Sequence, residues 1–120
     1  METKILIVED EADLCLLVQN FLETKEYVVQ SAYTFEEVMQ KVHTFEPDIV
    51  IMDYNLPGGK GTDLVSSIKK HNPRISVIVI SGMNEAQEAA RQSGAEQFIE
   101  KPFPLSKIGK AVEATGASGS

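Results

Sequence analysis

Apolar residues gather along the chain in short unbroken runs, and amphipathic segments separate them. The runs are rich in Ile and Val and occupy residues 4–9, 27–32, 48–53 and 75–80, with a weaker fifth run at 96–100. Strands buried on both faces of a parallel sheet have this uniformly apolar character, whereas strands with one wet face alternate. The pattern therefore predicts five strands, and the less uniform run at 27–32 suits an edge of the sheet.

The segments between the runs carry apolar residues at helical spacing. Leu14, Leu17, Val18 and Phe21 follow the i, i+3, i+4, i+7 rule of a helix with one buried face. Apolar spacing and end signals predict four further helices. The second helix begins at a capping box formed by Thr34 and Glu37, and the third begins at a cap at Thr62 and ends before Pro73. The fourth begins at a cap at Asn84 and ends at Gly94, and the apolar residues Leu105, Ile108 and Val112 mark the fifth.

Five strand–helix units in succession predict an α/β fold with a doubly wound parallel sheet and right-handed crossovers. The flavodoxin-like strand order 2-1-3-4-5 is one of the two orders common in this class. The length of 120 residues suits one domain, which we assign to residues 1–114. Residues 115–120, with the sequence TGASGS, carry no core pattern, and we interpret them as a linker stub or an added tail.

Charge and composition narrow the classes of partner. The formal net charge is −7, so direct binding of nucleic acid is not expected, because phosphate backbones require basic patches. No apolar run reaches the ~18 residues of a membrane span. The single cysteine, Cys15, excludes an internal disulfide and fits a reducing compartment. These features indicate a soluble, cytoplasmic domain.

Polar side chains stand where the predicted strands end. The first strand ends in Glu9 and Asp10, the third in Asp53, the fourth in Ser81, and the fifth in Lys101. In open α/β sheets, ligands bind outside the carboxyl ends of the strands at the topological switch point. With the order 2-1-3-4-5, the first and third strands are neighbours there, so the three carboxylates would meet in one crevice.

Each of these residues also has an ordinary structural interpretation. Asp10 could cap a helix, Asp53 and Ser81 could be turn residues, and Lys101 could pair with Glu100 at the surface. A shared site explains all of them together. Two carboxylates ~4 Å apart repel by roughly 4 kcal/mol at an effective dielectric of 20, so such a cluster requires a cation. Oxygen ligands favour Mg²⁺, and a metal, a carboxylate, a hydroxyl and a lysine together indicate phosphoryl transfer.

Four motifs in this order resemble the receiver domain of bacterial two-component response regulators. They are ILIVEDE (5–11), DIVIMDYNLPGGKG (48–61), VIVISG (77–82) and GAEQFIEKPF (94–103). Each is weak alone, but together, each at a strand end, they are highly specific. The similarity runs from Lys4 to about Ala114.

The resemblance implies a role for each matching residue, and it implies Mg²⁺ or Mn²⁺ as the metal. The resemblance implies that Asp53 is the phosphoacceptor and also a metal ligand, that Asp10 binds the metal directly, that Glu9 binds it through water, and that Asn55 binds it through its backbone carbonyl. It implies that Ser81 is the switch hydroxyl, Lys101 the phosphate-binding lysine and Phe98 the switch aromatic. It also implies that Pro102 follows a cis peptide bond. Ser81, Gly82, Phe98 and the Gly59–Gly61 segment depart from commoner family residues. These departures leave the chemistry intact.

The resemblance also implies partners. A sensor histidine kinase or a phosphotransfer protein would donate the phosphoryl group, and an output domain or effector protein would read the resulting change. A phosphorylation-dependent dimer is a further expectation. The domain would not be an enzyme, beyond self-phosphorylation from small donors and slow autodephosphorylation.

Three other functions remain open on the residues. A phosphatase of the haloacid dehalogenase type uses a second Asp two residues after its nucleophile, and here that position is Asn55, which cannot act as a general acid or base. A nucleotide or flavin binder is disfavoured because residues 58–62, GGKGT, lack phosphate-loop spacing. A receiver-like module that is never phosphorylated is the third. His43 and His71 are each isolated on a helical segment, and we interpret both as surface residues.

Overall fold

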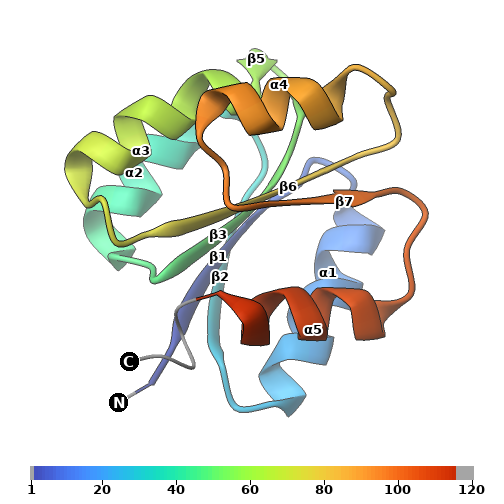
Figure 1. Ribbon diagram of the computed structural model, residues 1–120. Helices are drawn as coiled ribbons and strands as arrows, with labels where there is room; N and C mark the ends of the chain where they lie inside the picture. The colour runs from blue at the N-terminus through green and yellow to red at the C-terminus, as the bar shows by residue number, and fades with distance from the viewer. Residues whose placement is uncertain (1, 116–120) are drawn as a thin grey trace.

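Five parallel strands form one sheet, and helices cover both of its faces (Figure 1). The computed structural model describes residues 2–115. The sheet strands are β1 (Lys4–Val8), β2 (Val28–Ala32), β3 (Ile49–Asp53), β6 (Ser76–Ser81) and β7 (Gln97–Glu100). The helices are α1 (Ala12–Thr24), α2 (Phe35–Phe45), α3 (Val65–His71), α4 (Ala86–Ser93) and α5 (Leu105–Ala114). A small hairpin, β4 (Asn55–Leu56) and β5 (Gly59–Lys60), and a 3₁₀ turn, η1 (Gly61–Leu64), connect β3 to α3.

The strand order in the sheet is β2-β1-β3-β6-β7, with all neighbouring pairs parallel. Because β6 and β7 are the fourth and fifth sheet strands along the chain, this confirms the predicted order. The predicted edge strand β2 lies at one edge, and β7 lies at the other. The order reverses beside β1, so the carboxyl ends of β1 and β3 flank the switch point where ligands bind in this class of fold.

Successive residues of each central strand point to opposite faces of the sheet, and both faces are apolar. In β1, Leu6 and Val8 pack into a cluster under α2, α3 and α4, whereas Ile5 and Ile7 pack into a second cluster under α1 and α5. Helices α2, α3 and α4 lie together on one side in Figure 1, and α1 and α5 lie on the other. This two-sided burial explains why the strand sequences are unbroken apolar runs.

The buried face of α1 differs from the predicted one. Cys15, Val18 and Leu22 are buried, whereas Leu17, which the spacing assigned to the core, is 53% exposed. The error has a physical source: consecutive apolar residues on one helix are compatible with two neighbouring faces being buried, and the spacing rule does not choose between those faces. Packing selects the register that places Cys15 and Leu22 against the sheet.

The end signals of the helices were predicted correctly at some positions and wrongly at others. The capping box of Thr34 and Glu37 is present at the start of α2, and Gly94 follows α4 in the left-handed conformation with φ of 97°. Thr62 and Asn84, however, cap no helix: Thr62 lies within η1, and α4 begins after Glu85. Among the described residues, no helix has the length and apolarity needed to cross a membrane.

Candidate functional site

The carboxyl ends of β1 and β3 bring three acidic side chains together. Glu9 and Asp10 follow β1, Asp53 is the last residue of β3, and one carboxylate oxygen from each lies within 4.8 Å of the others. Glu9 and Asp53 are buried, with 1% and 6% of their surface exposed, and Asp10 is exposed. The three carboxylates therefore meet as predicted, two inside the protein and one at its surface, and we call this cluster the acidic crevice.

Lys101 supplies the positive charge of this site. Its ammonium lies 2.9 Å from Glu9 Oε1 and 2.9 Å from Asp53 Oδ2, and it lies 3.9 Å from Glu11. Its backbone N–H donates to the carbonyl of Ser81 at 2.9 Å, and the Lys101–Pro102 peptide bond is cis. The surface pair with Glu100 is therefore the wrong interpretation, because the ammonium points into the acidic crevice.

The loop after β3 folds back over the site and fixes the carboxylate of Asp53. The backbone N–H of Asn55 donates to Asp53 Oδ1 at 3.1 Å, and the N–H of Gly61 donates to the carbonyl of Tyr54 at 2.7 Å. Gly61 approaches so closely that a Cβ there would lie 2.3 Å from the carbonyl oxygen of Asp53. Asp53 is thus held by both its side chain and its backbone.

Burial and ion pairing shift the titration of two groups. Desolvation is the largest influence on Glu9 and raises its pKa to about 7, although hydrogen bonds from the Glu11 N–H and Lys101 act in the opposite direction. For Lys101, desolvation lowers the pKa, but the hydrogen bonds to Glu9 and Asp53 outweigh it, so the net direction is upward. Lys101 therefore stays charged, and Glu9 takes up a proton at a higher pH than an ordinary carboxyl does.

The donor set of the site fits a small hard cation such as Mg²⁺, which binds carboxylate oxygens together with water. Both oxygens of Glu9 already accept hydrogen bonds, Oε2 from the Glu11 N–H at 3.0 Å and Oε1 from Lys101. Asp10 is exposed, and no other described residue donates a hydrogen bond to its carboxylate. This difference suits a direct ligand at Asp10 and a contact through water at Glu9.

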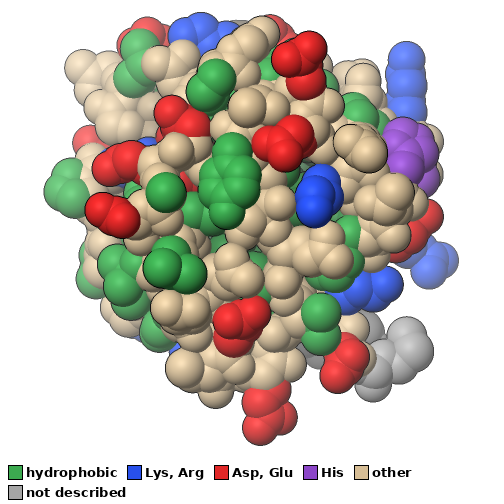
Figure 2. All heavy atoms as spheres, turned by 180° about the vertical axis from the view of Figure 1, so that it is seen from behind, with side chains coloured by type: hydrophobic (Ala, Val, Ile, Leu, Met, Phe, Trp, Pro, Cys, Tyr) green, Lys and Arg blue, Asp and Glu red, His purple; other side chains and the backbone are tan. Residues whose placement is uncertain are grey.

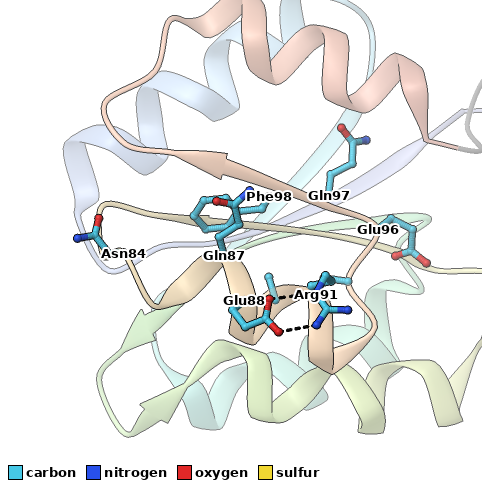
Figure 3. A pocket seen from close by; sticks show the side chains of 9 residues that line it. Asn84, Gln87, Glu88, Arg91, Glu96, Gln97 and Phe98 are labelled. Atoms are coloured by element: carbon cyan, nitrogen blue, oxygen red, sulfur yellow. Dashed lines mark hydrogen bonds and ion pairs between the residues drawn. The ribbon is translucent and has the colours of Figure 1, made fainter.

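Ser81 and Phe98 lie on neighbouring strands at the side of the site. Ser81 ends β6, is 2% exposed, and accepts a hydrogen bond from the Met83 N–H at its Oγ, 3.0 Å away. Phe98, on β7, is partly buried and lines a hollow of about 380 Å³ between β7 and α4. Figure 3 shows Phe98 of β7 and Gln87 of α4 among the residues that line this hollow. Val79 pairs with Phe98 across the sheet and Ser81 is two residues beyond Val79, so Ser81 and Phe98 face the same side of the sheet, the side covered by α4.

One contact at this site was not foreseen from the sequence. Lys60 of the β4–β5 hairpin donates to Asn55 Oδ1 at 2.9 Å, and its ammonium lies 4.9 Å from the centre of the Tyr54 ring. The short hairpin pairs Asn55 directly with Lys60. The turn residues Pro57 and Gly58 could have indicated this contact, because a hairpin with a two-residue turn there pairs Asn55 with Lys60.

Comparisons with known proteins agree on one family. The response regulator receiver domain model matches residues 5–113. The chain is 32% identical over 115 residues to the chemotaxis protein CheY of Thermotoga maritima, covering 93% of this chain and 96% of CheY. It is 34% identical over 112 residues to the nitrogen assimilation regulatory protein NtrX of Azorhizobium caulinodans, covering 90% of this chain but only 25% of NtrX. A two-component response regulator from Clostridium difficile superposes with a TM-score of 0.90 at 28% identity, covering 99% of this chain and 100% of that one.

Proposed function

The chain belongs to the response regulator receiver domain family, and from this membership we propose that Asp53 is the residue that accepts a phosphoryl group. Proteins of this family act in signalling as phosphoacceptors and are not classical enzymes. The observation that carries the proposal is the surroundings of Asp53, a buried carboxylate at a strand end with a backbone N–H on one oxygen and the Lys101 ammonium on the other.

The reaction follows from these contacts. A carboxylate oxygen of Asp53 attacks phosphorus, the bond between phosphorus and the donor atom breaks, and the donor leaves with the electron pair. Lys101 lies where it can stabilise the negative charge on the phosphoryl oxygens. A Mg²⁺ or Mn²⁺ ion held by Asp10, Asp53, the Asn55 carbonyl and, through water, Glu9 would neutralise charge on the same oxygens.

The acyl phosphate should persist long enough to act as a signal. Two residues beyond Asp53 the chain has Asn55, whose side chain accepts a hydrogen bond from Lys60 and cannot serve as a general acid or base. Without a general base to activate water, the acyl phosphate should hydrolyse slowly, so we expect slow autodephosphorylation. We also expect the domain to phosphorylate itself only from small donors such as acetyl phosphate.

Mass spectrometry of the intact protein after incubation with acetyl phosphate and Mg²⁺ tests the assignment. We expect one added phosphoryl group that hydroxylamine removes, and no label in Asp53→Asn or in excess EDTA. Asp63→Asn is the matched control, because Asp63 is an exposed aspartate in η1 and should label like the wild type. Full labelling of Asp53→Asn would exclude Asp53 as the acceptor.

We propose a sensor histidine kinase or a phosphotransfer protein as the physiological donor. An apolar hollow of about 370 Å³ lies beside the site, lined by Glu11, Leu14, Lys101, Pro102 and Phe103. Exposed Leu16 and Leu17 follow on α1, with 57% and 53% of their surface exposed. An apolar surface next to the acceptor suits a protein donor that must place its phosphoryl group over Asp53. A cytoplasmic location agrees with such a donor and stays a prediction.

The proposed output passes through Ser81 and Phe98. A phosphoryl group on Asp53 adds charge and strong acceptor oxygens, and the Ser81 hydroxyl is a donor that can turn toward them. Its Oγ now accepts from Met83 ahead of α4, so this movement would disturb the start of that helix. Phe98 then has space to move inward and reshape the α4–β7–α5 face, which an output domain, an effector or a second phosphorylated copy would read.

Beryllofluoride, which imitates the acyl phosphate, provides the test of this relay. In the wild type we expect chemical-shift changes at Asp53, in α4 and at Phe98. In Ser81→Ala the changes in α4 and at Phe98 should shrink while those at Asp53 persist, because a shift between states needs a differential contact. Ser93→Ala, a hydroxyl deletion at the far end of α4, is the matched control. Equal responses in wild type and Ser81→Ala would reject the relay and leave the acceptor assignment standing.

A further inference from the structure

His43 and His71, which the sequence analysis interpreted as isolated surface residues, are in contact. Their ring centres lie 4.4 Å apart, and the ring planes are tilted by 60°. His43 lies in the last turn of α2, and His71 is the last residue of α3. The two helices lie side by side on one face of the sheet (Figure 1). The fold therefore joins two imidazoles that are 28 positions apart (71 minus 43) in the sequence.

Each imidazole is oriented by a hydrogen bond from one of its ring nitrogens. Nδ1 of His43 lies 2.7 Å from the carbonyl oxygen of Met39, and Nε2 of His71 lies 3.1 Å from Oε1 of Glu46. A carbonyl and an ionised carboxylate only accept hydrogen bonds, so these two nitrogens carry the protons. In the neutral rings, the lone pairs then belong to Nε2 of His43 and Nδ1 of His71.

This arrangement is the one that protein ligands of transition metals adopt. A metal-binding histidine almost always donates its second ring N–H to a carboxylate or a backbone carbonyl, which fixes the tautomer and makes the other nitrogen a better ligand. Two imidazoles bound tetrahedrally to one ion at ~2.0–2.1 Å have ring centres roughly 5 Å apart. The observed distance of 4.4 Å is shorter, so the rings must separate slightly on binding, and His43 is exposed at the surface where such a movement is least hindered.

The electrostatic surroundings also favour a cation. The C-terminal ends of both α2 and α3 meet here, and the unpaired carbonyls of a helix C-terminus carry partial negative charge. Glu46, at the C-terminal cap of α2, adds a full negative charge next to His71. Lys69 and Lys70 lie in the same turn as His71, but the Lys69 ammonium is already paired with Glu96.

We propose that His43 Nε2 and His71 Nδ1 bind one divalent transition-metal ion of the Zn²⁺ type, clamping the C-terminal ends of α2 and α3, with Glu46 as the carboxylate that orients His71. Nitrogen ligands select Zn²⁺, Ni²⁺ or Cu²⁺ over Mg²⁺. Water completes the coordination. This site is separate from the acidic crevice, because helices of a βα unit run back along the sheet and end beside the amino ends of the strands.

Histidine appears at the surface in Figure 2, at the right-hand edge of the molecule, so an ion has access from solvent. Glu46 is 55% exposed at its side chain and His71 is 20% exposed. Binding also requires neutral imidazoles, so the affinity for Zn²⁺ should fall as the pH is lowered.

Titration of the whole chain with Zn²⁺ in excess Mg²⁺ tests the proposal, because Mg²⁺ then occupies the acidic crevice. Calorimetry should show one Zn²⁺ per chain. The imidazole ¹⁵N resonances of His43 Nε2 and His71 Nδ1 should shift most, which identifies the ligating atoms. Zn²⁺ should also raise the melting temperature, since it binds only the folded arrangement.

Four variants make the test specific. His43→Gln and His71→Gln should each lower the Zn²⁺ affinity at least tenfold, and Glu46→Gln should lower it about 10-fold or more by removing the carboxylate that orients His71. Glu36→Gln removes the same charge from the exposed N-terminal turn of α2 and should bind Zn²⁺ like the wild type. The proposal is overturned if both histidine variants keep the wild-type affinity and stoichiometry, or if Zn²⁺ shifts only resonances around Glu9 and Asp53.

Discussion

Lys101 and Asp53 form a 2.9 Å ion pair across 48 positions of sequence. The contact reaches from the loop after β7 to the end of β3, and β6 lies between the two strands. The same ammonium bonds Glu9 beyond β1. One flexible side chain therefore joins the carboxyl ends of three strands and neutralises part of the charge that gathers at them.

Replacing Lys101 by Met should weaken both the site and the fold. Glu9 and Asp53 would be left buried without their shared donor, and we expect a loss of about 1–3 kcal/mol in the free energy of unfolding at pH ~8 without metal. Phosphoryl uptake from acetyl phosphate should slow about a hundredfold or more, because a charge that stabilises the transition state is removed. Lys107→Met, an exposed lysine in α5, should change neither quantity. Chemical denaturation and mass spectrometry measure the two effects.

Stability should depend on pH through Glu9. Burial raises the pKa of Glu9 to about 7, so the folded chain binds this proton more readily than the unfolded chain. The contribution of Glu9 to stability is therefore fully present below the ordinary carboxyl pKa and is lost as the pH rises through about 7.

The measurement is the difference in unfolding free energy between wild type and Glu9→Gln in EDTA. Wild type minus variant should fall between pH ~5 and ~8, and excess Mg²⁺ should reduce the change by stabilising the ionised carboxylate. Glu36→Gln, an exposed carboxyl on α2, serves as the control and should show no such slope. A difference that rises over this window would contradict the assigned direction.

The close approach of Gly61 to Asp53 predicts an intolerant position. In Gly61→Ala the new Cβ would lie 2.3 Å from the Asp53 carbonyl oxygen and 2.9 Å from Met52 Cγ, so the backbone around the acceptor must move. We expect a loss of about 1–3 kcal/mol in stability together with slower phosphoryl uptake. Gly82→Ala is the matched control, because its Cβ would meet nothing closer than 3.8 Å. Equal melting temperatures for the two variants would argue against the steric account.

Substitutions at two adjacent leucines on α1 can show which side of that helix the phosphodonor contacts. Leu17 is three residues beyond Leu14, which lines the hollow beside Lys101, so both lie on one side of α1. Leu16 is also exposed but turns away from that side. If a protein donor docks over the hollow, Leu17→Glu should slow phosphotransfer more than Leu16→Glu, and neither should alter uptake from acetyl phosphate. The opposite ranking would place the donor over the other side of the helix.

The sequence predicted the sheet and the acidic crevice well because both follow from strong local patterns. Unbroken apolar runs specify strands buried on both faces, and the carboxyl ends of parallel strands lie at the same edge of the sheet. The proximity of Glu9, Asp10 and Asp53 could therefore be predicted from the sequence. Contacts between helices were harder. The register of α1 was wrong at Leu17, and the contact of His43 with His71 was missed. Such contacts depend on how far each helix is rotated about its own axis relative to its neighbour, and the spacing of residues along the chain does not determine that rotation.

The central place of β1 has a consequence for how the chain is made. Because β1 lies between β2 and β3, the first three strands are neighbours, and residues 4–53 can form a contiguous half of the sheet before β6 exists. When only this half of the chain has left the ribosome, the edge of β3 that later pairs with β6 is exposed. All five residues of β3 are buried in the finished domain. Unpaired apolar edges of this kind invite association with other chains. The interval between the emergence of β3 and the arrival of β6 is therefore when a nascent chain of this sequence most needs protection by chaperones.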